Sequence, residues 1–191
     1  DLATNANASL FETLTASVSA LLHTYAQQDD ILLGYPVANR EHPDTEQLIG
    51  FFVNTLVHRS KVDLETSFAA LLDTTAKDLR AAHQHHAVPF DKIIDLLDVE
   101  RDLSRPALID AMVVLQNNRQ STFSVPELSV ESIKLAPQIC QFDLTFHFAE
   151  TADGLAIELN YNRDLFNSAR MQTMLTHLSQ LMSLIIKTPA K

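Results

Sequence analysis

The chain has 191 residues, a length that suits one domain built around a single hydrophobic core. Its 14 Lys and Arg residues against 24 Asp and Glu residues give a formal net charge of −10, which argues against nucleic acid or an anionic membrane surface as the main partner. No apolar run approaches the roughly 18 residues of a membrane-spanning helix, and no signal segment opens the chain, so we expect a cytoplasmic protein.

Cysteine and glycine usage excludes several kinds of site. Cys140 is the only cysteine, so no disulfide can form within the chain, and we expect a small packed side chain rather than a nucleophile because no cation flanks it closely. The three glycines, Gly34, Gly50 and Gly154, are too scattered for a G-x-G-x-x-G fingerprint or a Walker loop. The sequence therefore carries neither nucleotide-binding fingerprint, and it has no H-E-x-x-H zinc motif.

The first elements follow from the spacing of apolar residues. Apolar side chains at helical spacing predict a helix from Leu10 to Tyr25, and Ser9 followed by Glu12 predicts its capping box. Residues 31–38 form a short β-rich run that predicts a strand, and a polar loop ends it.

After a turn around Gly50, an alternating run predicts a second strand. One face of this strand carries Val53, Thr55, Val57 and Arg59. The other face carries Asn54, Leu56 and His58.

Two helices are predicted next. Ser67 caps the first, whose apolar stripe consists of Phe68, Leu71, Leu72 and Leu79. Pro89 stands where the first turn of the second helix begins, and the apolar residues that follow are Phe90, Ile93, Ile94 and Leu97.

The last third of the chain predicts strands and a final helix. Residues 107–117 have a continuous apolar middle, as in a strand buried on both faces, and residues 142–150 alternate cleanly. A turn at Asp153–Gly154 predicts a hairpin, and a methionine-rich stripe predicts a helix from about Asn167. The whole predicts one domain, an α/β (α+β) sandwich with helices packed on one mixed sheet.

Three strings follow one another in a recognisable order: IGFFVNTLVHR at residues 49–59, HHAVPFDKI at 85–93 and RDLSRPAL at 101–108. Three flanking strings agree with them: QDDILLGYPVANR at 28–40, VVLQN at 113–117 and FDLTFHFAE at 142–150. Together they resemble the condensation domains of nonribosomal peptide synthetases. The resemblance covers most of the chain and implies the chloramphenicol-acetyltransferase-like fold of that family.

The chain departs from the family pattern at several positions. His86–Ala87 replaces the Gln and Asp of the second motif, and Pro106–Ala107 replaces the Asn and Pro of the third, so these positions receive no family role. The catalytic signature H-H-x-x-x-D-G does not occur, because Asp91 lies one place too late after His85 and no glycine follows it. We therefore expect residues 1–191 to be the C-terminal half of a condensation domain, without its N-terminal half and with no catalytic residue of its own.

The resemblance also implies a reaction and its partners. In the family, the amine of an acceptor aminoacyl thioester attacks the carbonyl of a donor thioester, and phosphopantetheine arms of carrier proteins bring both substrates into a tunnel between the two halves. This chain would form one tunnel wall and bind no cofactor directly. Its implied partners are the N-terminal half, peptidyl and aminoacyl carrier proteins and an adjacent adenylation domain. Half of an epimerisation domain and a non-catalytic carrier-protein-binding module are the alternatives.

Arg40 is the residue that the resemblance most clearly implicates. It matches the arginine that, in the family, pairs with the aspartate of the signature missing here, and a bidentate guanidinium would clamp that carboxylate. The alternative is a solvated loop arginine beside Glu41. Arg59 and Arg105 are expected to be structural, paired with nearby acids or carbonyls.

Two amide side chains are candidates for lining the tunnel. Asn54 either hydrogen-bonds a substrate arm or satisfies a loop backbone, and the sequence leaves both roles open. Gln116 ends a buried strand, where polar groups meet a cleft, so we favour a tunnel-lining role for it and not for the adjacent Asn117.

The histidines suggest a metal site or a general base at first sight. His83, His85 and His86 lie at a helix end just before a proline, where an imidazole serves the last carbonyls, and a zinc site would need further ligands at suitable spacing. We therefore expect no metal. His147 is expected on a strand surface. An isolated half-domain should also expose a large apolar patch, so self-association is predicted.

Overall fold

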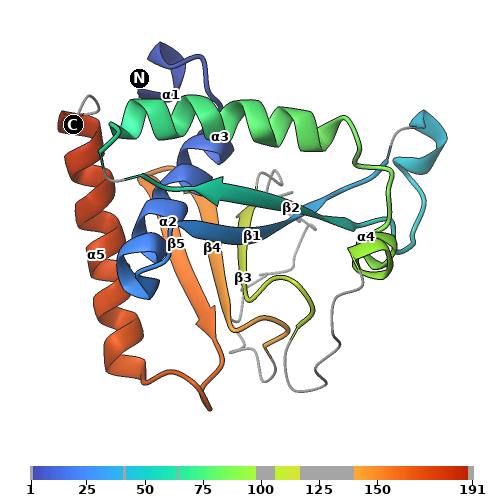
Figure 1. Ribbon diagram of the computed structural model, residues 1–191. Helices are drawn as coiled ribbons and strands as arrows, with labels where there is room; N and C mark the ends of the chain where they lie inside the picture. Colours follow the sequence, from blue (N-terminus) through green and yellow to red (C-terminus); the bar gives the residue numbers. More distant parts are fainter. Residues whose placement is uncertain (1, 41, 64, 98–105, 117–139, 189–191) are drawn as a thin grey trace, which may run out of the picture.

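The computed structural model describes residues 2–40, 42–63, 65–97, 106–116 and 140–188 (Figure 1). Within them, one mixed sheet has the strand order β2-β1-β3-β4-β5. Its strands are β1 (Asp30–Val37), β2 (Asn54–Lys61), β3 (Ala111–Gln116), β4 (Leu144–Thr151) and β5 (Gly154–Tyr161). β1 and β2 are antiparallel, as are β4 and β5, whereas β3 is parallel to both of its neighbours.

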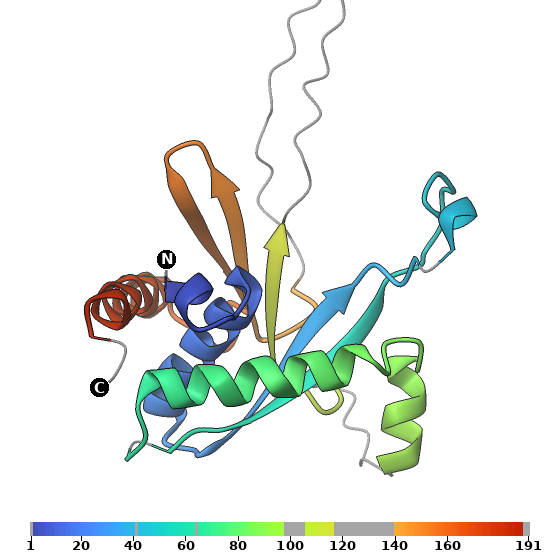
Figure 2. The same ribbon diagram turned by 90° about the horizontal axis from the view of Figure 1, so that it is seen from above.

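The longer helices form one layer on one face of this sheet (Figures 1 and 2). The helices are α1 (Leu2–Asn5), α2 (Leu10–Ala26), α3 (Phe68–His83), α4 (Phe90–Leu97) and α5 (Ser168–Lys187), with one 3-10 turn, η1 (Pro43–Thr45). α2 is central, because it contacts both α3 and α5 as well as β1 and β3. The much shorter α4 lies beside the start of β2. The predicted α/β sandwich is confirmed.

The helix ends are set by short polar side chains. At the start of α2, the Ser9 hydroxyl accepts a hydrogen bond from the Glu12 N–H, and the Glu12 carboxylate accepts one from the Ser9 N–H, which is the predicted capping box. The Ser67 and Asn167 side chains cap α3 and α5, each by accepting one hydrogen bond from a backbone N–H of the first turn. These caps lie where the sequence predicts them, because capping depends on residues within one helical turn.

The main core lies between the sheet and the layer of α2 and α5. Phe146 and Phe148 on β4, Leu14 and Val18 on α2 and Leu178 on α5 are all fully buried there. Met171 and Met174 fill the same core from α5, as the apolar stripe predicts. Burial of this much aromatic and aliphatic surface makes the core the main source of stability.

One strand is shorter than the prediction. The buried strand predicted over residues 107–117 begins only at Ala111, since the chain at 106–110 is irregular although Ile109 is fully buried. Gly34 on β1 explains the close approach there, because a Cβ at this position would clash with the Ile109 side chain. The hairpin turns as predicted, with Gly154 at a φ of 136°.

Candidate functional site

The connection between β1 and β2, residues 38–53, extends away from the sheet (Figure 2) and is called the arm below. Arg40, near the end of the arm that follows β1, contacts several other residues of the arm. The Arg40 Nη1 donates hydrogen bonds to the carbonyl oxygens of Thr45 and Leu48, the second at 3.0 Å. Its guanidinium also lies over the Phe52 ring, 4.2 Å from the ring centroid, in a cation–π contact. Arg40 therefore maintains the shape of the arm, and its predicted clamp to a second half stays a prediction.

The end of the arm next to β2 carries large apolar side chains that the described residues leave exposed. Phe51 is 94% exposed and Ile49 fully so, while Leu48 and Val53 expose about half of their surface. Exposed apolar side chains are ordinary when they are scattered, but these are consecutive or nearly so in one short segment. The segment 48–53 thus has the character of an interaction surface.

Asn54, the first residue of β2, is tied to the segment between α3 and α4. Its Nδ2 donates to the carbonyls of His86 (2.8 Å) and Val88 (2.7 Å). Its Oδ1 accepts from the N–H groups of Phe90 (3.1 Å) and Thr55 (2.9 Å). Both amide hydrogens and both lone pairs of the oxygen are in use. This geometry corresponds to the backbone-satisfying role of Asn54, and the tunnel-lining role stays a prediction.

The histidines at the end of α3 are arranged around backbone groups. The His86 Nδ1 lies 2.6 Å from the carbonyl oxygen of His83, and the two rings stack with centroids 4.9 Å apart. His83 is the last residue of α3, so an imidazole does serve a terminal carbonyl, as predicted. Within the described ranges, no three His, Cys, Asp or Glu side chains are grouped so that they could hold a metal ion.

The sheet face opposite the helix layer carries the remaining polar candidates. Since Phe146 and Phe148 point into the core, His147 between them points to this other face. Its Nε2 lies 3.1 Å from the Asn160 Nδ2 on β5, and burial lowers the pKa of His147 although Glu158 opposes that shift. Gln116 is exposed at the end of β3, where its tunnel-lining role stays a prediction.

Other predicted residues have structural contacts. The Arg59 guanidinium forms hydrogen bonds of 2.5 to 3.0 Å with both carboxylate oxygens of Asp30, which confirms its structural role. The Cys140 thiol donates to the Tyr161 carbonyl at 3.1 Å and is half-buried. Arg105 and Asn117 lie outside the described residues.

A family model for the condensation domain matches residues 1–191. The chain belongs to the condensation domain family. A linear gramicidin synthase of Brevibacillus parabrevis is 39% identical to it over 184 residues, 95% of this chain and 4% of that protein. Surfactin synthase subunit 1 of Bacillus subtilis (strain 168) is 36% identical over 190 residues, 100% of this chain and 5% of that protein. The chain thus spans only a small part of these relatives.

Solved structures show the same fold at lower identity. A four-domain nonribosomal peptide synthetase bound to AMP and glycine superposes with a TM-score of 0.92 and 21% identity, covering 100% of this chain and 16% of that one. The X-domain from teicoplanin biosynthesis gives a TM-score of 0.90 and 23% identity, covering 99% of this chain and 44% of that one. These likenesses confirm the predicted chloramphenicol-acetyltransferase-like fold.

In this condensation domain sequence, the structure joins two of the motif strings that the sequence presents separately. Asn54 belongs to IGFFVNTLVHR, and the three groups it holds at His86, Val88 and Phe90 belong to HHAVPFDKI. The third string contributes only residues 106–108 to the described part of the chain. No helix in that described part is long and apolar enough to cross a membrane.

Sequence reasoning missed two buried polar features of this condensation domain. Glu12 also accepts hydrogen bonds from Arg80 on α3 at 2.9 and 3.1 Å, which joins α2 to α3. Burial alone would raise the pKa of Glu12, but the hydrogen bonds from Arg80 and Ser9 hold it below its ordinary value. The second feature is the burial of His58, which is only 2% exposed. The alternation of residues along this strand predicts the face on which His58 lies but not how completely it is buried.

Proposed function

We propose that this chain is the C-terminal half of a peptide-bond-forming condensation domain and that it forms one wall of the tunnel in which two carrier-bound thioesters meet. The observation that carries the proposal is the match of a condensation domain model to the entire chain. A second observation supports the half-domain: the chain covers 44% of a condensation domain from Monacolin K polyketide synthase and 41% of the first condensation domain of the calcium-dependent antibiotic synthetase.

The proposed reaction requires orientation more than specialised chemistry. The acceptor amine nitrogen bonds to the donor carbonyl carbon, the donor C–S bond breaks, the amine loses a proton, and the donor arm leaves as a thiol. Holding the two thioesters in a fixed tunnel lowers the barrier mainly by proximity. This chain contributes a wall and no acid or base, because the H-H-x-x-x-D-G signature is not among its residues. It is therefore inactive alone.

The arm supplies a surface for the second half. Its apolar segment 48–53 is exposed in the described structure, and Arg40 holds the base of the same loop by hydrogen bonds to backbone carbonyls. Covering Ile49 and Phe51 by the N-terminal half would remove apolar surface from water, which favours association. In the assembled domain Arg40 would then pair with the aspartate of the catalytic signature across the interface between the two halves.

The proposed partners follow from the family. Donor and acceptor carrier proteins would deliver their substrates on phosphopantetheine arms, and no cofactor would be held by this chain itself. An adenylation domain would stand next to it in the same synthetase, in the cytoplasm. The four-domain synthetase that shares this fold is bound to AMP and glycine, which supports an architecture that includes amino-acid activation.

A binding role without peptide-bond formation is the second candidate. The X-domain of teicoplanin biosynthesis, which shares this fold, has been solved in a complex with OxyB, and its chain superposes with a TM-score of 0.87. A domain of this fold can therefore serve as a docking partner. An epimerisation half is a less suitable interpretation, because FVNTLVHR at residues 52–59 resembles the condensation form of that segment.

The proposal is tested by reconstituting the reaction. We expect no amide product when this chain is mixed with donor and acceptor carrier proteins loaded with aminoacyl thioesters. Product should appear in the complete domain, in which an N-terminal half carries H-H-x-x-x-D-G. A complete domain with its second signature histidine changed to Ala is the matched control. Product from this chain alone would overturn the assignment of catalysis to the other half, and a complete domain that binds carriers without forming product would favour the docking role.

A further inference from the structure

The neighbouring elements β1, β2 and α3 contain polar side chains that are buried without partners. The side chains of Tyr35 on β1, His58 on β2 and Thr75 on α3 each bury polar atoms that lack a hydrogen-bond partner among the described residues. Both ring nitrogens of His58 belong to this set. Leaving a buried polar group unpaired destabilises a protein, so three such side chains on neighbouring elements call for a ligand.

The geometry of the two elements brings these groups together. Leu56 and Leu79 pack in one cluster with Tyr35, and α3 runs back over β2 after the turn that follows Val62. Two strand residues advance the chain by about 6.6 Å, which equals roughly four helical residues. The residue of α3 above His58 is thus one turn before Leu79, which is Thr75.

Tyr35 completes the set from the neighbouring strand. Leu33 is paired directly with His58, and Tyr35 with Leu56, so Tyr35 and His58 are diagonal neighbours on the same face of the sheet. Diagonal side chains on adjacent strands are within reach of each other when one is aromatic. The Phe11 ring of α2 lies against Tyr35 with centroids 5.3 Å apart and brings no polar atom to it.

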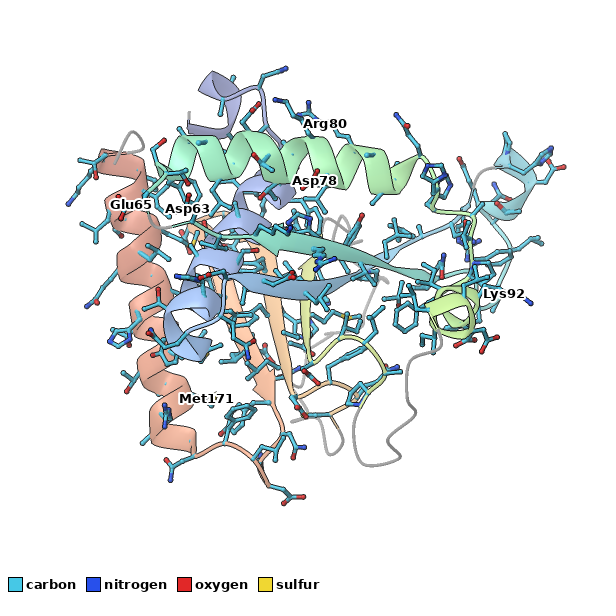
Figure 3. All side chains as sticks on the ribbon, viewed as in Figure 1. Asp63, Glu65, Asp78, Arg80, Lys92 and Met171 are labelled. Atoms are coloured by element: carbon cyan, nitrogen blue, oxygen red, sulfur yellow. The ribbon has the colours of Figure 1, made fainter. Side chains whose placement is uncertain are left out.

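We propose that ordered water is bound inside the protein between β2 and α3, where it bridges the His58 imidazole to the Thr75 hydroxyl and reaches the Tyr35 hydroxyl. Water is the ligand class that fits, since imidazole, hydroxyl and phenol together offer both donors and acceptors and a buried water needs two to four polar partners. Asp78 on α3 (Figure 3) is the charged group whose field favours protonated His58, against the effect of burial. The contact between α3 and the sheet therefore contains water.

The site connects to the motif strings through the backbone. His58 lies four residues after Asn54 on β2, and Thr75 lies on the helix that leads to the segment held by Asn54. Water under α3 would therefore hold the helix at one height above β2 and keep the His86 and Val88 carbonyls within reach of Asn54.

A crystal structure of the complete condensation domain tests the proposal directly. We expect water density within about 3.2 Å of a His58 ring nitrogen and of the Thr75 Oγ1. A dry interface, with His58 bonded to another side chain or with no density beside it, would overturn the proposal.

Stability of variants of the same domain gives an independent test. Thr75→Val and Tyr35→Phe each remove one oxygen with little change in shape. If water bridges the groups, each variant lowers the denaturant midpoint, and Thr75→Val combined with His58→Leu costs less than the sum of the two. If the groups are merely unpaired, removing an oxygen raises the midpoint instead. Thr74→Val is the matched control, since its hydroxyl is exposed and bonded to the Ala70 carbonyl.

Discussion

Two phenylalanines illustrate two regions of the molecule that differ in how much apolar surface they expose. Phe146 on β4 is completely buried beneath α2 and α5, whereas Phe51 in the arm is 94% exposed. The first belongs to a core that this chain completes by itself. The second belongs to a loop that is held in shape by polar contacts from Arg40 and has little core of its own. The apolar surface of the arm is therefore not covered by the described residues of this chain, which supports the proposed contact with a second half.

The largest difference in stability should appear when a phenylalanine in each region is replaced by alanine. Phe146→Ala leaves a cavity in a close-packed core and should lower the free energy of unfolding of the chain by about 3–5 kcal/mol. Phe51→Ala removes an exposed ring and should change it by no more than about 0.5 kcal/mol. Urea titrations of both variants measure the difference. Equal costs would show that Phe51 is buried in solution and that the comparison fails.

Arg40→Ala in the complete domain tests the role of the arm. If Arg40 clamps a carboxylate of the other half, its loss should cost about 3–5 kcal/mol of stability and most of the turnover. If it only closes the arm, the cost should be near 1 kcal/mol and hydrogen exchange should rise in residues 42–52 alone.

Arg40→Lys provides the matched control for that prediction. Lysine keeps the charge but lacks the planar fork, so it should restore only part of a clamp. Normal stability together with normal turnover in Arg40→Ala would contradict the clamp.

Asn54 marks the border between the arm and the sheet. Asn54→Ala removes four hydrogen bonds and leaves the His86 and Val88 carbonyls without their donor, so we expect a loss of about 1–3 kcal/mol. Asn54→Asp keeps the acceptor for the Phe90 N–H but places a carboxylate against those carbonyls. The Phe90 amide should then stay protected from hydrogen exchange in the Asp variant and lose protection in the Ala variant. Equal exchange in both would remove Asn54 as the anchor of this segment.

His58 should make the stability of the protein depend on pH. Burial lowers the pKa of His58 below its ordinary value, and Asp78 offsets only part of the shift. The unfolded chain therefore binds a proton more readily than the folded one below about pH 6.5, and stability should fall as the pH falls from there through the folded pKa. Denaturant midpoints measured from pH 7.5 to 5 should fall less in His58→Leu. An unchanged slope would assign the dependence to other histidines.

The smallest effect on stability, and the most informative for the arm, should come from Ile49→Ser combined with Phe51→Ser. Both side chains are exposed, so the isolated chain should keep its midpoint within about 0.5 kcal/mol. Its self-association, measured by light scattering over a concentration series, should weaken, because less apolar surface is covered on contact. Unchanged association would place the associating surface elsewhere.

The elements that the sequence predicts well are those set by neighbours along the chain. The capping box at Ser9 and Glu12, the hairpin at Gly154 and the stripe of α5 all depend on residues within a few positions of one another. The start of β3 was less well predicted, because Ile109 is apolar and buried but reaches the core from an irregular segment against Gly34. The apolar character of Ile109 agrees with its burial but does not predict the backbone conformation in which it is buried.

The family resemblance, the helix caps, the alternation of the strands and the lack of the catalytic signature within these residues can all be predicted from the sequence, because each depends on residues close together in the chain. Contacts between groups far apart in the chain follow from the tertiary structure alone. It placed the His86 and Val88 carbonyls on the Asn54 amide and buried His58 on β2. The physical reason is that hydrogen bonds and burial depend on how α3 packs on β2, and no local pattern encodes the height and direction of that packing.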